Sequence, residues 1–326
     1  MSTIEKPSQK SLMLFSGRAY PALADEIAEH LGVTVTPTSS YAFANGELYA
    51  RSEESARGAD VFVIQSHTTP INDWLMEQLI LVDALKRASA KRITVVSPFF
   101  PYARQDKKSR GREPITARLV ADMYTAAGAD RIISVDLHTA QIQGFFNGPV
   151  DHLFATPILT EYINNKYAGE PITVVSPDAG RVRLSERWSE YLGGTPLAFI
   201  HKTRDVTQPN MTVANRVVGE VSGRLCVLID DMIDTGGTIC KAADALVAEG
   251  AKDVIIATTH GILSDPAAQR LADAPVSEVI LTNTLPIPPE KMLAKMTVLS
   301  IAPLIARAIK EIFEDGSVTS LFDGDA

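Results

Sequence analysis

One stretch, residues 227–238, limits the fold and the chemistry of this chain more than any other part of the sequence. It reads Val-Leu-Ile-Asp-Asp-Met-Ile-Asp-Thr-Gly-Gly-Thr. The aliphatic residues at its start show no polar alternation, which is typical of a parallel strand covered on both faces. Open α/β sheets bind their ligands at the carboxyl ends of such strands. We expect this strand to end at Asp230 and Asp231, which places both acids in a ligand site.

The residues after the two acids predict a phosphate-binding turn. Asp234-Thr235-Gly236-Gly237-Thr238 leads into a helix expected over 239–248. Glycine lets the backbone approach a phosphate closely, and the first amides of a helix are free to donate to it. The threonine hydroxyls add donors, and the paired acids can hold sugar hydroxyls or a hydrated metal ion. A phosphorylated sugar fits this pattern. A Walker loop does not, because no Lys-Ser or Lys-Thr follows the glycines. The plain alternative is a strand–turn–helix with acidic turn residues.

Short β-rich runs alternate with amphipathic stretches along most of the chain. The runs are 61–65, 93–97, 132–135, 172–176, 225–229, 254–257 and 279–281, and the clearest helical patterns are 71–88 and a stretch from Pro114 to about 127. Such alternation predicts parallel sheets with helices on both faces.

The chain repeats part of its own pattern. Gly128-Ala129-Asp130 leads to His138 as Gly250-Ala251-Lys252 leads to His260, 122 positions later. The run 61–65 pairs roughly with 172–176, and 93–97 with 225–229, at offsets of 111 and 132 positions. We infer two similar α/β domains in tandem, at 9–155 and 156–310, joined near 151–157. A tail over 311–326 follows as an expected interface segment.

Composition narrows the class of protein. A chain of 326 residues with 45% apolar residues is long enough for two packed domains. The net charge of −8 argues against a nucleic-acid partner. No apolar run reaches the roughly 20 residues that span a bilayer, and the first ten residues lack a signal-peptide core. Cys226 and Cys240 are the only cysteines, and we expect both to be buried. We expect a cytoplasmic protein without a membrane partner.

A second motif follows the run 93–97. Residues 98–106 read Pro-Phe-Phe-Pro-Tyr-Ala-Arg-Gln-Asp, where the prolines and aromatic rings stiffen the loop. Arg104 can pair with a phosphate or stack on a base, and Gln105 can bond to an adenine edge. The alternative is a rigid turn with a surface arginine.

The combined motifs resemble the phosphate-regulated class I ribose-phosphate pyrophosphokinases (phosphoribosyl pyrophosphate synthetases). The resemblance covers about 14–322 and rests on 43–47, 102–106, 112–116, 136–138, 143–146, 175–178 and 230–238. It implies two type I phosphoribosyltransferase-like domains, each with a mainly parallel sheet flanked by helices. It also implies transfer of pyrophosphate from ATP to the C1 hydroxyl of ribose 5-phosphate. The products are AMP and phosphoribosyl pyrophosphate, for nucleotide, histidine and tryptophan synthesis.

The resemblance assigns the binding residues. The residues expected to contact ATP are Arg104, Gln105 and Asp106, with Phe43, Asn45, Gly46 and Glu47 reaching in from a neighbouring subunit. Many relatives have Asp at position 45. The residues expected to hold ribose 5-phosphate are Arg204, Asp230, Asp231, Asp234, Thr235, Gly236, Gly237 and Thr238.

The resemblance also places a Mg²⁺ ion at His138 and Asp178. Each of these residues follows an expected strand. Mg²⁺ prefers oxygen ligands and keeps several waters, so chemistry alone would not choose a histidine, and a water molecule can bridge it to the ion. A histidine at a strand end is otherwise most often a structural group.

Lys202 and Arg204 resemble the catalytic residues of a flap. His201 and Thr203 depart from the Asp-Lys-Arg-Arg of many relatives, but the two key positions remain. The reaction needs positioning and neutralisation of developing charge, which these cations and Mg²⁺ can supply. No side chain stands out as a general base. Exposed bases on a loop are the alternative.

Two other activities compete with this assignment. A true phosphoribosyltransferase shares the loop 230–238 but lacks the motif 104–106. A non-catalytic subunit of the same family would not need His138, Asp178, Lys202 and Arg204. The family further implies hexamers, and phosphate activation and ADP inhibition at a subunit interface. Arg57, Arg110 and 317–322 resemble parts of that regulatory region. Gly111 replaces a serine often found in that region.

Overall fold

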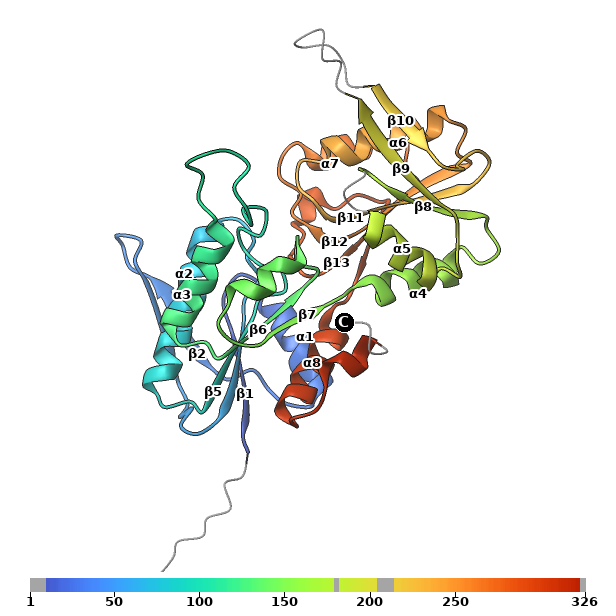
Figure 1. Cartoon of the computed structure of the whole chain (residues 1–326). Helices are drawn as coiled ribbons and strands as arrows, with labels where there is room; N and C mark the ends of the chain where they lie inside the picture. The colour runs from blue at the N-terminus through green and yellow to red at the C-terminus, as the bar shows by residue number, and fades with distance from the viewer. Residues whose placement is uncertain (1–9, 179–181, 204–213, 323–326) are drawn as a thin grey trace, which may run out of the picture. The chain divides into compact units, whose positions relative to one another are not determined.

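The computed structural model describes residues 10–178, 182–203 and 214–322. The chain divides into two compact units, Met1–Leu153 with Ala302–Ala326, and Phe154–Ile301. Figure 1 shows the elements of each unit along the chain. No helix within those ranges is both long and apolar enough to cross a membrane.

The first unit is built on a parallel sheet. Within the described residues it has five strands in the order β1-β4-β5-β6-β7, namely β1 (Leu12–Ser16), β4 (Asp60–Ile64), β5 (Arg92–Val96), β6 (Arg131–Val135) and β7 (Val150–Leu153). The helices of the unit are α1 (Pro21–Leu31), α2 (Ile71–Arg87), α3 (Thr116–Ala127), α8 (Ala302–Phe313) and the 3₁₀ turns η1 (Ala140–Phe145) and η4 (Val318–Phe322). A separate antiparallel hairpin joins β2 (Thr38–Ala42) to β3 (Leu48–Ser52). Figure 1 shows α2 and α3 on one side of the sheet and α1 and α8 on the other.

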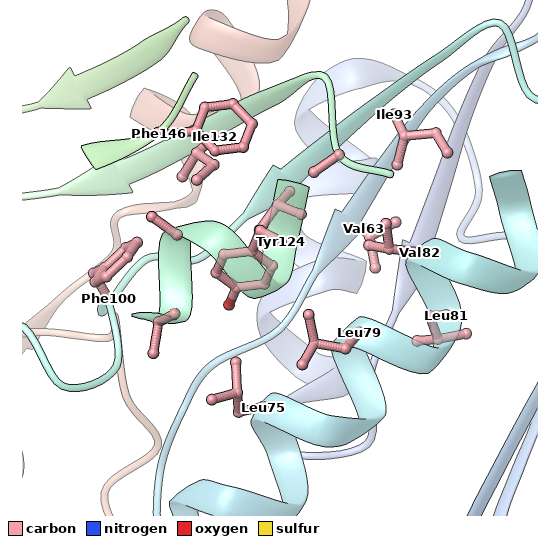
Figure 2. Packing of buried hydrophobic residues seen from close by; sticks show 14 of the residues in the cluster. Val63, Leu75, Leu79, Leu81, Val82, Ile93, Phe100, Tyr124, Ile132 and Phe146 are labelled. Atoms are coloured by element: carbon pink, nitrogen blue, oxygen red, sulfur yellow. The ribbon is translucent and has the colours of Figure 1, made fainter. Parts of the chain in front are cut away.

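Apolar spacing explains how α2 and α3 pack on this sheet. The stripe predicted over 71–88 forms α2, and Leu75, Leu79 and Val82 are buried along it. Figure 2 shows these side chains on the side of α2 that faces Val63 and Tyr124. Tyr124 comes from α3 and is fully buried. One hydrophobic core of the first unit therefore lies between the sheet and these two helices.

Helix α8 belongs to the first unit, although it follows the second unit along the chain. Helix α8 packs against α1, and Lys10 donates to the carbonyl of Phe313 and to Asp315, the latter at 2.6 Å. Arg92 at the start of β5 pairs with Asp60 and also with Asp315, at 2.9 Å. The sequence-based limit of 310 for the second domain placed α8 with that domain, whereas its contacts tie it to the first unit.

The second unit is built on a larger sheet. As far as the chain is described, it has seven strands in the order β10-β9-β8-β11-β12-β13-β14, parallel except for β10. They are β8 (Ile172–Ser176), β9 (Leu197–Thr203), β10 (Ala214–Val218), β11 (Leu225–Ile233), β12 (Asp253–Gly261), β13 (Glu278–Thr282) and β14 (Met296–Leu299). The helices are α4 (Thr156–Lys166), α5 (Val182–Tyr191), α6 (Gly237–Ala248), α7 (Ala267–Asp273) and the short η3 (Pro289–Lys291). Figure 1 shows α4 and α5 on one side of this sheet and α6 and α7 on the other.

The strand orders agree with the internal repeat. The offset of 122 residues aligns β6 with β12, while β4 and β5 pair with β8 and β11 by their order along the chain; each set forms neighbouring parallel strands in that order. The predicted fold class is confirmed: both units are α/β, with mainly parallel sheets flanked by helices.

Several element boundaries were predicted wrongly, and two of them concern predicted ligand-binding segments. Strand β11 does not end at Asp230 but continues to Ile233, because its pairing with β12 continues to Gly261. Helix α3 begins at Thr116 and not at Pro114. Its first turn is held by the preceding loop, since the amide of Ala117 donates to the carbonyl of Gln105.

Candidate active site

The segment from β11 to α6 holds the predicted sugar-phosphate residues together. The register of β11 with β8 ends at Leu228, while that with β12 continues to Ile233. Asp230 and Asp231 lie in this part of β11, where the sheet narrows. Neighbouring strand residues point to opposite faces, and Asp231 is 5% exposed while Asp230 is half-buried. Asp230 is therefore the more accessible carboxylate, and its Oδ1 accepts the amide of Asp231 at 2.9 Å.

The turn after β11 presents backbone amides. Gly236 has φ +73°, a conformation that glycine adopts without a steric penalty. It is the N-cap residue of α6 and has no side chain with which to cap the first amides. Those amides are left to other partners, and an anion at a helix start also meets the positive end of the helix dipole. Thr235 and Thr238 are exposed beside them, so this turn suits a phosphate group.

The remaining predicted residues of the second unit lie near the ends of β8 and β9. Asp178 is half-buried, and its carbonyl accepts the hydroxyl of Ser176 at 2.6 Å. Lys202 lies in β9, in register with Asn215 of β10. Arg204 and the loop of the predicted flap lie outside the described residues.

In the first unit, the loop after β5 is anchored at its start and exposed at its end. Phe99 and Phe100 are buried, whereas Arg104 and Gln105 are exposed. Tyr102 has φ +61°, which is unusual for a bulky residue and typical of functional loops. Gln105 also serves the fold, because its Oε1 accepts the hydroxyl of Thr116 at 2.6 Å. The exposed end of the loop is therefore held in one place by the start of α3.

Asp106 connects this loop to the turn that carries His138. Asp106 is 5% exposed, and its Oδ2 accepts bonds from Thr139 at 2.7 Å and Gln141 at 2.6 Å. On the other side of this turn, Nε2 of His152 accepts the amide of Leu137 at 2.8 Å. The structure thus brings two of the predicted motifs, 98–106 and 136–138, together within the first unit. The bonds of Asp106 to protein groups favour a positioning role over contact with ATP.

The predicted turn 43–47 forms the tip of the β2–β3 hairpin. All five of its residues are exposed, with Phe43 at 47%. Oδ1 of Asn45 accepts the amide of Glu47 at 3.2 Å, as an aspartate at this position could. The rings of Tyr41 and Phe43 meet edge to face at 5.3 Å. The asparagine therefore keeps the hydrogen bond that shapes the turn.

A buried polar network that the sequence motifs do not predict lies under the loop. His67 is 1% exposed, and its Nδ1 lies 3.2 Å from the carbonyl of Phe99 and 3.1 Å from the hydroxyl of Ser97. Tyr124 lies 3.3 Å from its Nε2 and donates to Gln78 at 2.7 Å. Burial lowers the pKa of His67 to about 4, so the ring is neutral at physiological pH.

A buried carboxylate holds the hairpin to the unit. Glu77 accepts bonds from Arg18 and Ser40, both at 2.5 Å, and from Gln65 at 2.7 Å. Burial alone would raise the pKa of Glu77, but these bonds hold it below its ordinary value. Because Ser40 lies on β2, Glu77 fixes the base of the exposed turn. A signal existed in the sequence for the neighbouring Gln78, which lies between Leu75 and Val82 on the apolar stripe of α2.

Known proteins resemble this chain from end to end. The model of the N-terminal domain of ribose phosphate pyrophosphokinase matches residues 12–128, and that of the phosphoribosyl synthetase-associated domain matches 196–323. A ribose-phosphate pyrophosphokinase of Streptomyces coelicolor is 64% identical over 323 residues, which cover 99% of both chains. The chain belongs to the ribose-phosphate pyrophosphokinase family.

Other members of this family match equally well. A ribose-phosphate pyrophosphokinase of Mycobacterium leprae is 64% identical over 319 residues, 98% of each chain. The crystal structure of phosphoribosylpyrophosphate synthetase from Mycobacterium smegmatis is 63% identical with a TM-score of 0.90. It covers 94% of this chain and 100% of its own. The family assignment therefore rests on both units.

Carboxylate oxygens of the second unit match the ligand preference of a magnesium ion better than the imidazole of His138 does. Mg²⁺ is usually held by one or two carboxylates together with substrate phosphates, and Asp178, Asp230 and Asp231 offer such oxygens. His138 is half-buried after β6 in the first unit. Across the described ranges, no three His, Cys, Asp or Glu side chains form a metal-binding group. The assignment of His138 and Asp178 to the metal stays a prediction.

Proposed function

We propose that this chain is an ATP-dependent ribose-phosphate pyrophosphokinase. It transfers the pyrophosphoryl group of ATP to the anomeric hydroxyl of ribose 5-phosphate and releases AMP. The observation that carries the proposal is the 64% identity to enzymes of that name over 99% of the chain. A phosphoribosyltransferase is less well supported, because it leaves the loop 98–106 of the first unit without a role.

The second unit binds the sugar phosphate in this proposal. The phosphate lies against the amides of 235–238 at the start of α6, where the helix dipole favours a negative charge. Asp230 accepts bonds from the ribose hydroxyls, and Asp231 and Asp234 support the loop from either side. This arrangement directs the anomeric hydroxyl away from the phosphate-binding turn.

The first unit binds ATP in this proposal. Arg104 pairs with phosphate oxygens and Gln105 contacts the adenine, while Asp106 holds their loop against the turn of His138. Phe43, Asn45 and Glu47 complete the site of a neighbouring subunit. The exposed position of the hairpin tip supports that role, since its side chains are free to enter a second copy of the chain.

The chemical step depends on charge and position more than on proton transfer. An oxygen of ribose attacks the β-phosphorus while AMP leaves in line, and negative charge develops on the phosphoryl oxygens. Lys202 and Arg204 neutralise that charge. Mg²⁺, when held by carboxylates such as Asp178, would neutralise the phosphates and order them. The enzyme excludes water so that ATP is not hydrolysed.

The assembly and the location are also part of the proposal. A shared ATP site requires at least a dimer, and we propose a hexamer built from such dimers. We place the enzyme in the cytoplasm, where ATP and ribose 5-phosphate are available. Phosphate activation and ADP inhibition at a subunit interface stay predictions of the family resemblance.

One assay tests the proposed activity. AMP formation from ATP is measured with and without ribose 5-phosphate, and the product is identified by ³¹P NMR. We expect AMP and phosphoribosyl pyrophosphate in equal amounts and only when both substrates are present. A chain that instead consumes phosphoribosyl pyrophosphate with a base is a phosphoribosyltransferase. A chain inactive in both assays is a non-catalytic subunit.

A further inference from the structure

The loop assigned to the sugar phosphate has a cationic neighbour on α7. Arg270 lies in the last turn of α7, and its Nη1 donates to the carbonyl oxygen of Thr235 at 2.9 Å. The same nitrogen would lie 3.2 Å from a Cβ atom added to Gly237. The guanidinium group therefore packs against the loop both before and after Gly236.

The bond to Thr235 fixes the orientation of the next amide. In a trans peptide the C=O and the following N–H point in opposite directions. Arg270 holds the carbonyl of Thr235 toward α7, so the N–H of Gly236 points away from α7. Glycine at φ +73° can adopt several backbone conformations, which means that this peptide could rotate if it were not held. Arg270 supplies the restraint.

We propose that Arg270 is a positioning residue for the 5-phosphate of the sugar substrate. It holds the peptide between Thr235 and Gly236 with the amide directed at the phosphate, and its permanent positive charge strengthens that site. This inference rests on the proposed function of the loop. Arg270 acts through the backbone, so it affects ribose 5-phosphate binding more than ATP binding or the chemical step.

The same contact changes the interpretation of Gly237. The sequence suggested that Gly237 leaves room for the phosphate itself. The structure places the guanidinium group of Arg270 beside that position, 3.2 Å from a built Cβ. A methyl group there must displace the side chain by a few tenths of an ångström. Gly237 therefore makes room for Arg270. It affects phosphate binding indirectly, by allowing Arg270 to hold the loop.

Substitution of Arg270 tests the role of its side chain. Arg270→Met nearly keeps the length but removes the charge and the donors, while Arg270→Lys keeps the charge and a donor group without the planar fork. Gln269→Ala is the matched control, because Gln269 is exposed on the same helix and bonds to Asp273. KM for each substrate, kcat and calorimetric binding of ribose 5-phosphate are measured for all of them.

We expect Arg270→Met to raise KM and Kd for ribose 5-phosphate about tenfold or more, the scale for losing a charged hydrogen bond. KM for ATP and kcat at saturation should change little, Arg270→Lys should recover part of the loss, and Gln269→Ala should match wild type. An unchanged Kd for ribose 5-phosphate in Arg270→Met overturns the proposal. Equal increases of KM for both substrates overturn it as well.

The role of Gly237 is tested by combining substitutions. Gly237→Ala is made in the wild-type chain and in Arg270→Met. We expect it to raise Kd for ribose 5-phosphate in the first background and to have little further effect in the second. Equal increases in both backgrounds would mean that the methyl group meets the phosphate directly, which overturns the inferred link between Gly237 and Arg270.

The binding measurement separates this inference from the proposed activity. If the wild-type chain binds ribose 5-phosphate but forms no AMP, the proposed function fails while the comparison of Kd values still tests Arg270. Thermal unfolding of each variant, with and without ribose 5-phosphate, checks that the fold is intact. A variant with the wild-type unfolding temperature but a reduced shift on adding ligand supports the inference.

Discussion

At the scale of single residues, Lys202 is the side chain most closely tied to the proposed chemistry. We expect Lys202→Ala to lower kcat by roughly 10²-fold or more, the effect of removing one donor that stabilises charge in a transition state. Binding of ribose 5-phosphate should change little, because the interaction strengthens only as the reaction proceeds. Steady-state kinetics and calorimetry measure the two effects. A variant with near-normal kcat would remove Lys202 from the mechanism.

His67 predicts how stability depends on pH. Its pKa is lowered to about 4 by burial, while in the unfolded chain it is about 6.5. Between pH 4 and pH 6.5 only the unfolded state binds the proton. The stability that the fold gains from neutral His67 is therefore complete above pH 6.5 and is lost as pH falls to 4. The loss amounts to roughly 3 kcal/mol, at 1.36 kcal/mol per pKa unit.

Urea unfolding of wild type and His67→Gln between pH 4 and pH 7 measures this contribution. The variant should lose less stability than wild type over that range, although it starts from a lower value at pH 7 because bonds to Ser97 and Phe99 are changed. Parallel pH profiles for the two proteins would mean that His67 is not the titrating group.

At the scale of elements, Asp106 joins two loops from neighbouring strands. Asp106→Ala should raise KM for ATP several-fold, because the loop of Arg104 and Gln105 then loses its tie to Thr139 and Gln141. Thr139, which is half-buried, and Gln141, which is exposed, also lose their acceptor, but both can turn to water, so the loss of stability should be small. Asp106→Asn keeps an acceptor oxygen and should retain most of the affinity. If the two variants have the same KM for ATP, the negative charge of Asp106, and not its hydrogen bonds to the turn, controls ATP binding.

The sequence predicted those elements whose signal is local. The apolar runs of β5, β8 and β11 and the stripe of α2 follow from burial and periodicity, and the turn 234–238 follows from glycines before a helix. The end of β11 could not be predicted from a local signal, because it depends on pairing with β12, whose residues are about thirty positions away. The loop after β5 was also recognised, but the bonds of Asp106 to the turn after β6 could not be foreseen.

The missed parts of the site are contacts between distant segments. Arg270 reaches Thr235 across 35 positions, and Tyr124 approaches His67 across 57. Nothing in the local sequence around Arg270 distinguishes it from an exposed helix residue. Gln78 is different, since a polar side chain on an apolar helix stripe indicates a buried network even without a structure.

At the scale of the whole molecule, the shared-site proposal predicts recovery of activity in mixed assemblies. One variant is altered at Glu47 on the hairpin and another at Asp231 near the sugar loop, and each should be nearly inactive alone. After the variants are mixed, dissociated and reassembled, some sites combine an intact hairpin with an intact sugar loop. Activity should then return to a fraction of wild type. If the subunits exchange but the mixture stays inactive, each site is built from one chain.

The packing of α8 against α1 has a consequence for how the chain is made. Because residues 302–326 belong with 1–153, the second unit is an insertion within the first. During synthesis on the ribosome, the continuous segment 154–301 is complete before the first unit receives its last helix. The face of α1 that α8 covers stays uncovered until 302–313 has been made. The first half of the chain to emerge is therefore the last to finish folding.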